Sequence, residues 1–337
     1  MSRRIRGVLA PVVTPFKADL APDRERFITQ CQWLLSQNCG LAPFGTTSEA
    51  NSMSSDERMS LLDALVAAGI EPLRMMPGTG CCSITETVTL TAHAVKHGCA
   101  GVLMLPPFYY KDVSEEGLYG YFSEVVERVA DARLRIYLYH IPPVAKVGIT
   151  PKLVERLLKA YPNAIAGMKD SSGDWHNTKT FLEDFGRTAF DVFVGSESFL
   201  LANMCNGGAG TISATANINP AAIFALYKSA KFQAPNPNLQ RNTNQRSAVA
   251  VASAVTADEG LEAQQTRLNA IREVFSSKKF PSMIAAIKQA IAICTNEPEW
   301  ARVRPPLIEL TPAQANLLAA ELQRIGFAMN AIKRTEN

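Results

Sequence analysis

A lysine stands at the end of a strongly apolar stretch, residues 164–169. If this stretch forms a buried strand, the amine of Lys169 lies largely out of water, and desolvation disfavours its ammonium form. A neutral amine can attack a ketone carbonyl and form an imine, which withdraws electrons from the neighbouring carbon. The alternative is a structural lysine that pairs with Asp170 or extends its charge into water.

Two further groups could serve the same chemistry. Tyr139 ends the preceding apolar run, and its phenol could carry protons to and from a carbonyl substrate. Thr46 and Thr47 follow a glycine at the end of an earlier run, where hydroxyls and backbone N–H groups could hold a carboxylate. The structural alternatives are a packed tyrosine with a satisfied hydroxyl and a turn that caps a helix.

The spacing His93-x-x-x-His97 suits metal ligands on a helix, but the motif lacks the glutamate of zinc proteases. The pair also lies at the end of its predicted helix, 83–97, on the side away from the strand ends that carry Lys169 and Tyr139. We therefore expect a surface or packing role for the pair and no metal site.

These side chains must be positioned by the chain around them, which alternates short apolar runs with amphipathic stretches. Helix signals separate the runs, among them the capping box Ser54-x-x-Glu57 and the pair Thr150-Pro151. Eight such units predict a (β/α)₈ TIM barrel, with an open doubly wound sheet as the alternative. In a barrel, the residues that end the strands meet at one face. The predicted buried strands are 7–13, 40–44, 73–77, 101–105, 134–139, 164–169, 190–194 and 210–214.

Strand signals stop after residue 228. Residues 231–247 are rich in Asn, Gln and Pro, which is typical of a loop or linker. Helical patterns resume at 258–275, 282–293 and 312–330. We therefore expect two units, a catalytic barrel over 1–228 and a C-terminal three-helix module over 229–337.

The composition excludes several classes of function. The net charge is +3 over 337 residues, without a dense Lys/Arg stripe, so we expect no nucleic-acid partner. No stretch approaches the roughly 20 apolar residues of a membrane helix. The seven cysteines are odd in number and lie mostly in apolar segments. Buried, reduced thiols in a cytoplasmic protein are the expectation.

Three motifs together carry a resemblance to a known family. In their order and spacing they resemble the dihydrodipicolinate synthase/N-acetylneuraminate lyase family, and the likeness runs from Gly7 to the helical tail. The motifs are Gly45-Thr46-Thr47, Tyr139-His140-Ile141-Pro142 and Gly167-Met168-Lys169-Asp170-Ser171.

The resemblance implies a class I (Schiff-base) pyruvate aldolase or lyase on a (β/α)₈ barrel, assembled as a homotetramer without metal or organic cofactor. Its substrates would be pyruvate or another 2-keto acid, together with an aldehyde. Lys169 matches the family's imine-forming lysine, and Tyr139 matches its proton-relay tyrosine. Thr46 and Thr47 match the pair that holds the pyruvate carboxylate and links to that tyrosine.

Further positions are assigned by the same resemblance. Tyr110, or Tyr109 if the local gap falls differently, matches an aromatic residue that a neighbouring subunit lends to the site. Gly195 and Ile212 match positions that line the bound pyruvate. Ser48 replaces the usual second glycine of the family turn, and this places a hydroxyl beside the carboxylate site.

Val144 is the departure that bears most on the substrate. True dihydrodipicolinate synthases carry an arginine here, which clamps the carboxylate of the aldehyde. Valine makes no such contact, and Lys146 could replace the arginine only as a point charge. The sequence therefore predicts a less cationic aldehyde side, which favours neutral hydroxyaldehydes or aromatic aldehydes over aspartate semialdehyde.

The resemblance leaves the reaction partly open. The alternatives are dihydrodipicolinate synthase itself, a dehydratase of 2-keto-3-deoxy sugar acids, and a catalytically silent 2-keto-acid sensor. Residues 231–256 also look like an insertion relative to the family.

Overall fold

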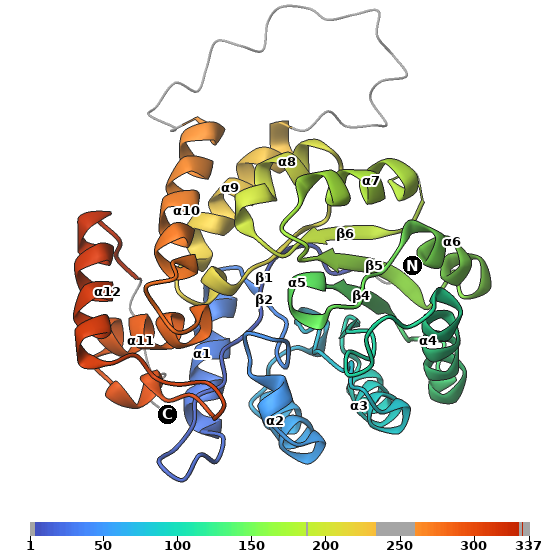
Figure 1. Cartoon of the computed structure of the whole chain (residues 1–337), viewed down its shortest axis with the longest axis horizontal. Coiled ribbons are helices and arrows are strands. Elements are labelled where there is room, and N and C mark those ends of the chain that lie inside the picture. Colours follow the sequence, from blue (N-terminus) through green and yellow to red (C-terminus); the bar gives the residue numbers. More distant parts are fainter. Residues whose placement is uncertain (1–3, 187, 234–259, 330–331, 333–337) are drawn as a thin grey trace, which may run out of the picture.

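The computed structural model describes residues 4–186, 188–233, 260–329 and 332. Seven parallel strands lie at the centre, and helices surround them (Figure 1). The strands are β1 Gly7–Ala10, β2 Gly40–Leu41, β3 Val102–Met104, β4 Ile136–His140, β5 Ile165–Asp170, β6 Asp191–Val194 and β7 Gly210–Ile212. The helices around them are α1 Arg24–Ser36, α2 Ser55–Ala67, α3 Ile84–Lys96, α4 Glu115–Val129, α5 Pro142–Ala145, α6 Pro151–Ala160, α7 Trp175–Phe185, α8 Leu200–Cys205 and α9 Pro220–Gln233.

The sheet runs in the order β2-β1-β7-β6-β5-β4-β3, so the first strand lies beside the last. Between the two ends of this order lies the segment after α2. Met75 makes a parallel bridge to Leu41 of β2, and Gly78 makes one to Leu103 of β3. These bridges connect the edges of the sheet and complete the predicted barrel.

The prediction of a regular third strand over residues 73–77 is wrong. Residues Pro72–Arg74 form a short 3-10 helix, and Pro77 has no N–H to donate to a ladder. Gly78 lies so close to the neighbouring chain that a Cβ atom would come within 2.1 Å of the Phe44 carbonyl oxygen. The segment therefore makes single bridges on either side in place of a ladder.

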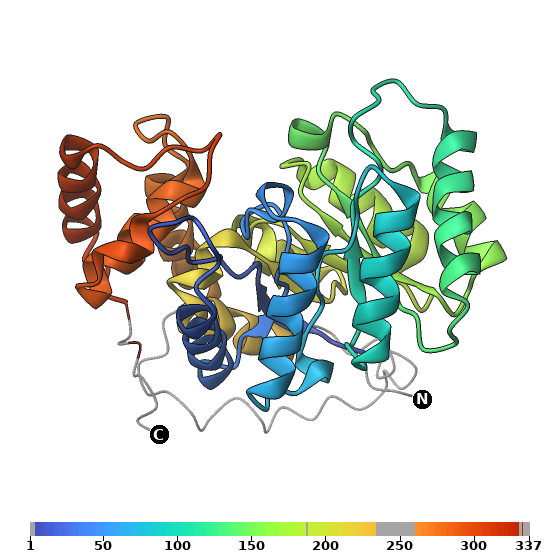
Figure 2. The same ribbon diagram turned by 90° about the horizontal axis from the view of Figure 1, so that it is seen from below.

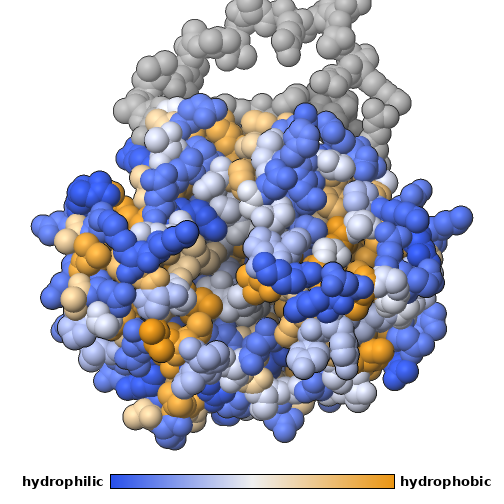
Figure 3. Space-filling view, viewed as in Figure 1, coloured by the Kyte–Doolittle hydropathy of each residue, from blue (hydrophilic) through white to orange (hydrophobic). Residues whose placement is uncertain are grey.

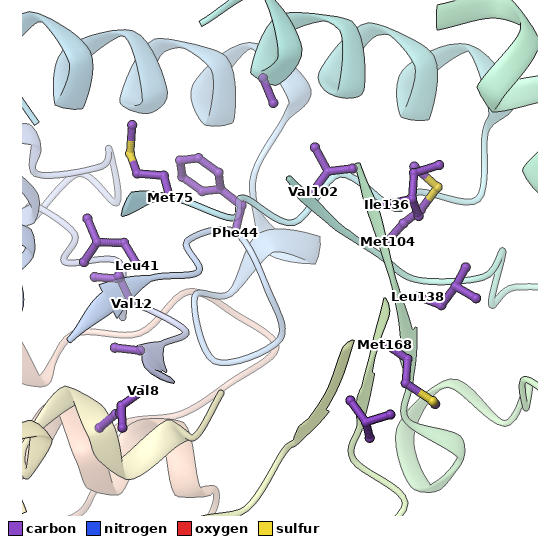
Figure 4. Close-up of a cluster of buried hydrophobic side chains, with 14 of the residues drawn as sticks. Val8, Val12, Leu41, Phe44, Met75, Val102, Met104, Ile136, Leu138 and Met168 are labelled. Carbon is purple, nitrogen blue, oxygen red and sulfur yellow. The ribbon is translucent and has the colours of Figure 1, made fainter. Parts of the chain in front are cut away.

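The strands alternate their side chains between two hydrophobic clusters, as the two-residue period of a strand requires. One set points outward and packs under the helices, and Figure 4 labels ten of its members, including Val8, Ile136 and Leu138. The other set fills the barrel interior and includes Leu9, Tyr137 and Tyr139. A residue of this second set near the end of a strand therefore faces the mouth of the barrel.

The predicted helix starts are confirmed. Ser54 and Glu57 form the capping box of α2. Thr150 accepts a hydrogen bond from the Leu153 N–H at the start of α6, and Pro151 is the first residue of that helix. The capping residues in the sequence thus predict where these helices begin.

Three helices follow the barrel, as predicted: α10 Leu261–Ser276, α11 Met283–Thr295 and α12 Pro312–Arg324. They lie at one side of the barrel (Figure 2) and share a hydrophobic cluster with Val13 and Ile218. The division between 228 and 229 falls inside α9, and it remains a proposal. Most of the insertion expected at 231–256 lies outside the described residues.

The surface is of mixed polarity, and the cysteines differ in their burial. Hydrophilic residues and smaller hydrophobic areas alternate on the face shown in Figure 3. No helix among the described residues has the length and apolar character needed to cross a membrane. All seven cysteines are free, but only Cys31 and Cys39 are buried. The expectation of buried thiols is therefore wrong for the other five.

Candidate active site

Neighbouring strands bring Lys169 and Tyr139 together. Lys169 of β5 is in register with Tyr139 of β4 on one side and with Phe193 of β6 on the other. Tyr139 and Phe193 both belong to the interior cluster. Partners in register point to the same face of a sheet, so the Lys169 side chain enters the barrel.

The amine of Lys169 is almost fully buried, with 4% of the residue exposed. Its Nζ donates to the Tyr139 hydroxyl at 3.3 Å and lies 4.3 Å from the centre of that ring. Among the described residues, no carboxylate lies within 4.0 Å of this amine, whereas Asp170 accepts from Ser172, Asn177 and Thr178. The salt bridge to Asp170 considered in the sequence analysis is thus not formed.

The turn after β2 joins this pair through a hydroxyl. Thr46 Oγ1 lies 3.3 Å from the Tyr139 hydroxyl, so Thr46, Tyr139 and Lys169 form a continuous hydrogen-bonded row. Within the described part of the chain, the backbone N–H groups of Thr46 and Thr47 have no hydrogen-bond acceptor. Two unused N–H groups beside two hydroxyls could hold a small anion.

A cavity of about 330 Å³ opens above this row, a volume at the small end of the usual range for ligand sites. Thr46, Thr47, Tyr139 and Lys169 all line it, as the sequence analysis expected. Gly195 and Ile212 also line it. At Gly195 a Cβ atom would come within 1.9 Å of the Ser171 hydroxyl, so this wall of the cavity requires glycine.

Ser48 does not reach the cavity. The residue is fully buried, and its hydroxyl has no hydrogen-bond partner in the described ranges. Its carbonyl accepts from the Thr14 hydroxyl at 2.7 Å. Ser48 therefore packs behind the threonine pair.

Tyr109 and Tyr110 also lie outside the cavity of their own chain. Their rings contact each other edge to face, with centres 5.3 Å apart, and the residues are 74% and 73% exposed. The geometry does not distinguish between the two as the residue lent to a neighbour.

His140 serves the loop that follows β4. Its Nδ1 accepts from the Ile149 N–H at 2.9 Å. Burial lowers the pKa of His140, while the charge of Asp170 acts in the opposite direction. The imidazole fixes the segment that carries Val144, which lines the cavity and is 61% exposed.

Two charged residues near the cavity were not predicted from the sequence. Glu197 lies two positions after Gly195, directly beyond the end of β6, so the strand-end rule could have found it. Arg272 lines the cavity from α10, outside the barrel, where that rule does not apply. The Nη1 atom of Arg272 donates to Glu197 Oε2 at 2.9 Å.

The histidine pair lies elsewhere. The Nε2 atoms of His93 and His97 lie 2.9 and 2.7 Å from the same oxygen of Asp63. These three residues could hold a metal ion together. None of the three lines the cavity of Lys169, and their contacts join α2 to α3.

The chain is similar in sequence to several known proteins. The model of the dihydrodipicolinate synthetase family matches residues 4–245. An uncharacterized DapA-like lyase of Chloroflexus aurantiacus is 31% identical over 323 residues, covering 95% of this chain and 97% of the relative. A 4-hydroxy-tetrahydrodipicolinate synthase of Thermus thermophilus is 35% identical over 225 residues, covering 67% of this chain and 74% of the relative.

Solved structures agree. The dihydrodipicolinate synthase of Agrobacterium tumefaciens has a TM-score of 0.80 and 30% identity, with 95% of this chain and 99% of that chain covered. A variant of the 2-keto-3-deoxygluconate aldolase of Sulfolobus solfataricus has a TM-score of 0.77, with 95% and 96% covered. Its 18% identity shows a shared fold alone.

Proposed function

The chain belongs to the dihydrodipicolinate synthetase family and is a carbon–carbon lyase; from this premise we propose that Lys169 forms an imine with pyruvate or another 2-keto acid. The observation that carries the proposal is the buried amine of Lys169, hydrogen-bonded to Tyr139 at the base of a cavity. From this position the amine can reach the keto carbon of a substrate that enters the cavity.

The proposed reaction uses the two hydrogen bonds that join Lys169, Tyr139 and Thr46. The amine adds to the keto carbon, and the keto oxygen leaves as water once the Tyr139 hydroxyl has protonated it. The Tyr139 phenolate then takes a proton from the methyl carbon, and the iminium becomes an enamine. That carbon attacks the aldehyde, whose oxygen receives a proton from Tyr139. Water then hydrolyses the iminium, which regenerates the Lys169 amine and returns a proton to Tyr139.

The carboxylate of the keto acid is assigned to the threonine turn. The hydroxyls and the unused backbone N–H groups of Thr46 and Thr47 belong to residues that line the cavity, and Thr46 is joined to the amine through the Tyr139 hydroxyl. Gly195 and Ile212 also line the cavity. Ser48 supports this turn from behind.

A homotetramer and an aromatic residue from a neighbouring subunit belong to the same proposal. The exposed pair Tyr109 and Tyr110 supports it, because tyrosine is enriched at protein–protein interfaces. Dihydrodipicolinate synthase and a sugar-acid dehydratase share the imine step and remain the alternative activities. We also propose a cytoplasmic location, because enzymes of this family are generally cytoplasmic.

The test uses pyruvate alone, so it needs no knowledge of the aldehyde. An enamine exchanges the methyl protons of pyruvate with solvent, and NMR in deuterated water follows the loss of the methyl signal. We expect rapid exchange with the wild-type protein and none with Lys169→Met. Lys152→Met, which changes a lysine with a 77% exposed side chain on α6, is the matched control and should exchange normally. Exchange that survives in Lys169→Met would contradict the proposal.

A further inference from the structure

We propose that Arg272 forms the binding subsite for the second substrate and selects an aldehyde that carries a carboxylate. This inference rests on the proposed function and adds the substrate class. It starts from one fact: a guanidinium from the C-terminal module lines the same cavity as Lys169 and Tyr139.

The α10 helix is fixed to the barrel next to this arginine. The amide of Gln265 donates to the Glu197 carbonyl at 2.9 Å and accepts from the Leu201 N–H at 3.1 Å. Gln265 and Arg272 are seven residues apart and so lie on one face of the helix. The contacts of Gln265 therefore orient Arg272 toward the loop after β6.

Glu197 holds the guanidinium in place. Its side chain is 1% exposed, and its two oxygens accept from the hydroxyls of Ser213 and Thr215 and from Arg272. A carboxylate with this many donors has a single stable orientation. We assign Glu197 as a positioning residue for Arg272.

One edge of the guanidinium remains available. The Nη1 atom makes both hydrogen bonds recorded for Arg272 among the described residues, to Glu197 and, at 3.3 Å, to Ser213. The Nε and Nη2 atoms form the edge that binds a carboxylate through two parallel hydrogen bonds. The Arg272 side chain is 21% exposed, and the residue borders the cavity.

The rest of the cavity wall suits such a substrate. Apolar residues also line the cavity, among them Ile141, Val144 and Phe199. An aldehyde with a short carbon chain and a terminal carboxylate suits a cavity that combines an amine, apolar side chains and a guanidinium. Arg272 thus supplies a cation that Val144 does not, and the preference for neutral aldehydes expected from Val144 alone is reversed.

The test compares two aldehydes of equal size at fixed pyruvate: succinic semialdehyde and its terminal amide, 4-oxobutanamide. We expect the wild-type protein to have the higher kcat/KM for the carboxylate. Arg272→Gln should lower that value by about 10–100-fold, as the loss of a charge-assisted hydrogen bond implies, and should leave the amide nearly unchanged. Arg272→Lys should restore part of the preference, because it keeps the charge and loses the fork.

Two further variants separate positioning from general damage. Glu197→Gln should raise KM for the carboxylate more than it lowers kcat. Arg324→Gln removes an exposed cation of α12 and should leave kcat/KM unchanged for both aldehydes. Equal use of the two aldehydes by the wild-type protein, or equal losses in Arg272→Gln, would overturn the inference. Methyl exchange of pyruvate in Arg272→Gln at the wild-type rate would show that the imine chemistry stands independently.

Discussion

At the scale of single residues, the proposed chemistry depends on the hydrogen-bonded row of Lys169, Tyr139 and Thr46. These residues could be predicted because each ends a strand or begins the next loop. Arg272 could not be predicted in this way. Its place beside Glu197 joins positions 75 residues apart in different modules, and no local pattern encodes that contact.

Removal of one hydroxyl tests the proton relay. In Tyr139→Phe the ring and its packing remain, while the hydrogen bonds to Lys169 and Thr46 are lost. We expect turnover to fall by ~10²–10⁴-fold, which is the usual contribution of a general acid–base group. Steady-state kinetics and thermal unfolding measure the two effects separately.

The matched control is Tyr137→Phe. Tyr137 is on the same strand and in the same interior cluster, but its hydroxyl donates to Asp191 at 3.4 Å and does not line the cavity. We expect turnover close to that of the wild type. Near-normal turnover in Tyr139→Phe, or equal losses in both variants, would remove Tyr139 from the mechanism.

At the scale of elements, a buried ion pair joins α11 to the turn that carries Thr46 and Thr47. Lys288 donates to Glu49 at 2.6 Å and to the Thr14 carbonyl at 2.8 Å, and both charged side chains are fully buried. Burial lowers the pKa of Lys288 to about 8, although Glu49 acts in the opposite direction. Glu49 also accepts from the Arg304 N–H at 2.9 Å.

Loss of one partner should therefore be costly. Lys288→Met leaves Glu49 buried without its cation, and we expect the free energy of unfolding to fall by about 3–5 kcal/mol. Because Glu49 ends the threonine turn, KM for pyruvate should rise as well. Urea unfolding and initial-rate kinetics measure these two changes.

A double variant provides the control. Lys288→Met with Glu49→Gln removes both charges and should recover part of the lost stability, because a neutral amide is less costly to bury. A loss below about 1 kcal/mol in Lys288→Met would mean that the ion pair is not needed to hold the turn.

Most elements could be predicted from periodicity and capping, and their failures have local causes. The 3-10 turn at Pro72–Arg74 and the missing N–H of Pro77 explain why 73–77 makes bridges alone. The cysteines show a different limit. The apolar neighbours of Cys82, Cys205 and Cys294 in the sequence led us to expect buried thiols, but these three residues are exposed.

At the scale of the whole molecule, the C-terminal helices contribute to the site as well as to the fold. Arg272 and Met283 from this module line the cavity, and Lys288 pairs with Glu49 at the end of the threonine turn. The division into a catalytic barrel and an appended module therefore follows the order of elements along the chain, whereas the candidate site contains residues of both parts. Residues of the barrel, α10 and α11 together line the candidate site.

The central claim is the covalent bond between Lys169 and a 2-keto acid, and reductive trapping tests it most directly. The intact protein is incubated with pyruvate and borohydride, digested, and analysed by mass spectrometry. We predict a single reduced three-carbon adduct on Lys169, absent when pyruvate is omitted and absent from Lys169→Met. No adduct, or an adduct on another lysine such as Lys288, would contradict the account.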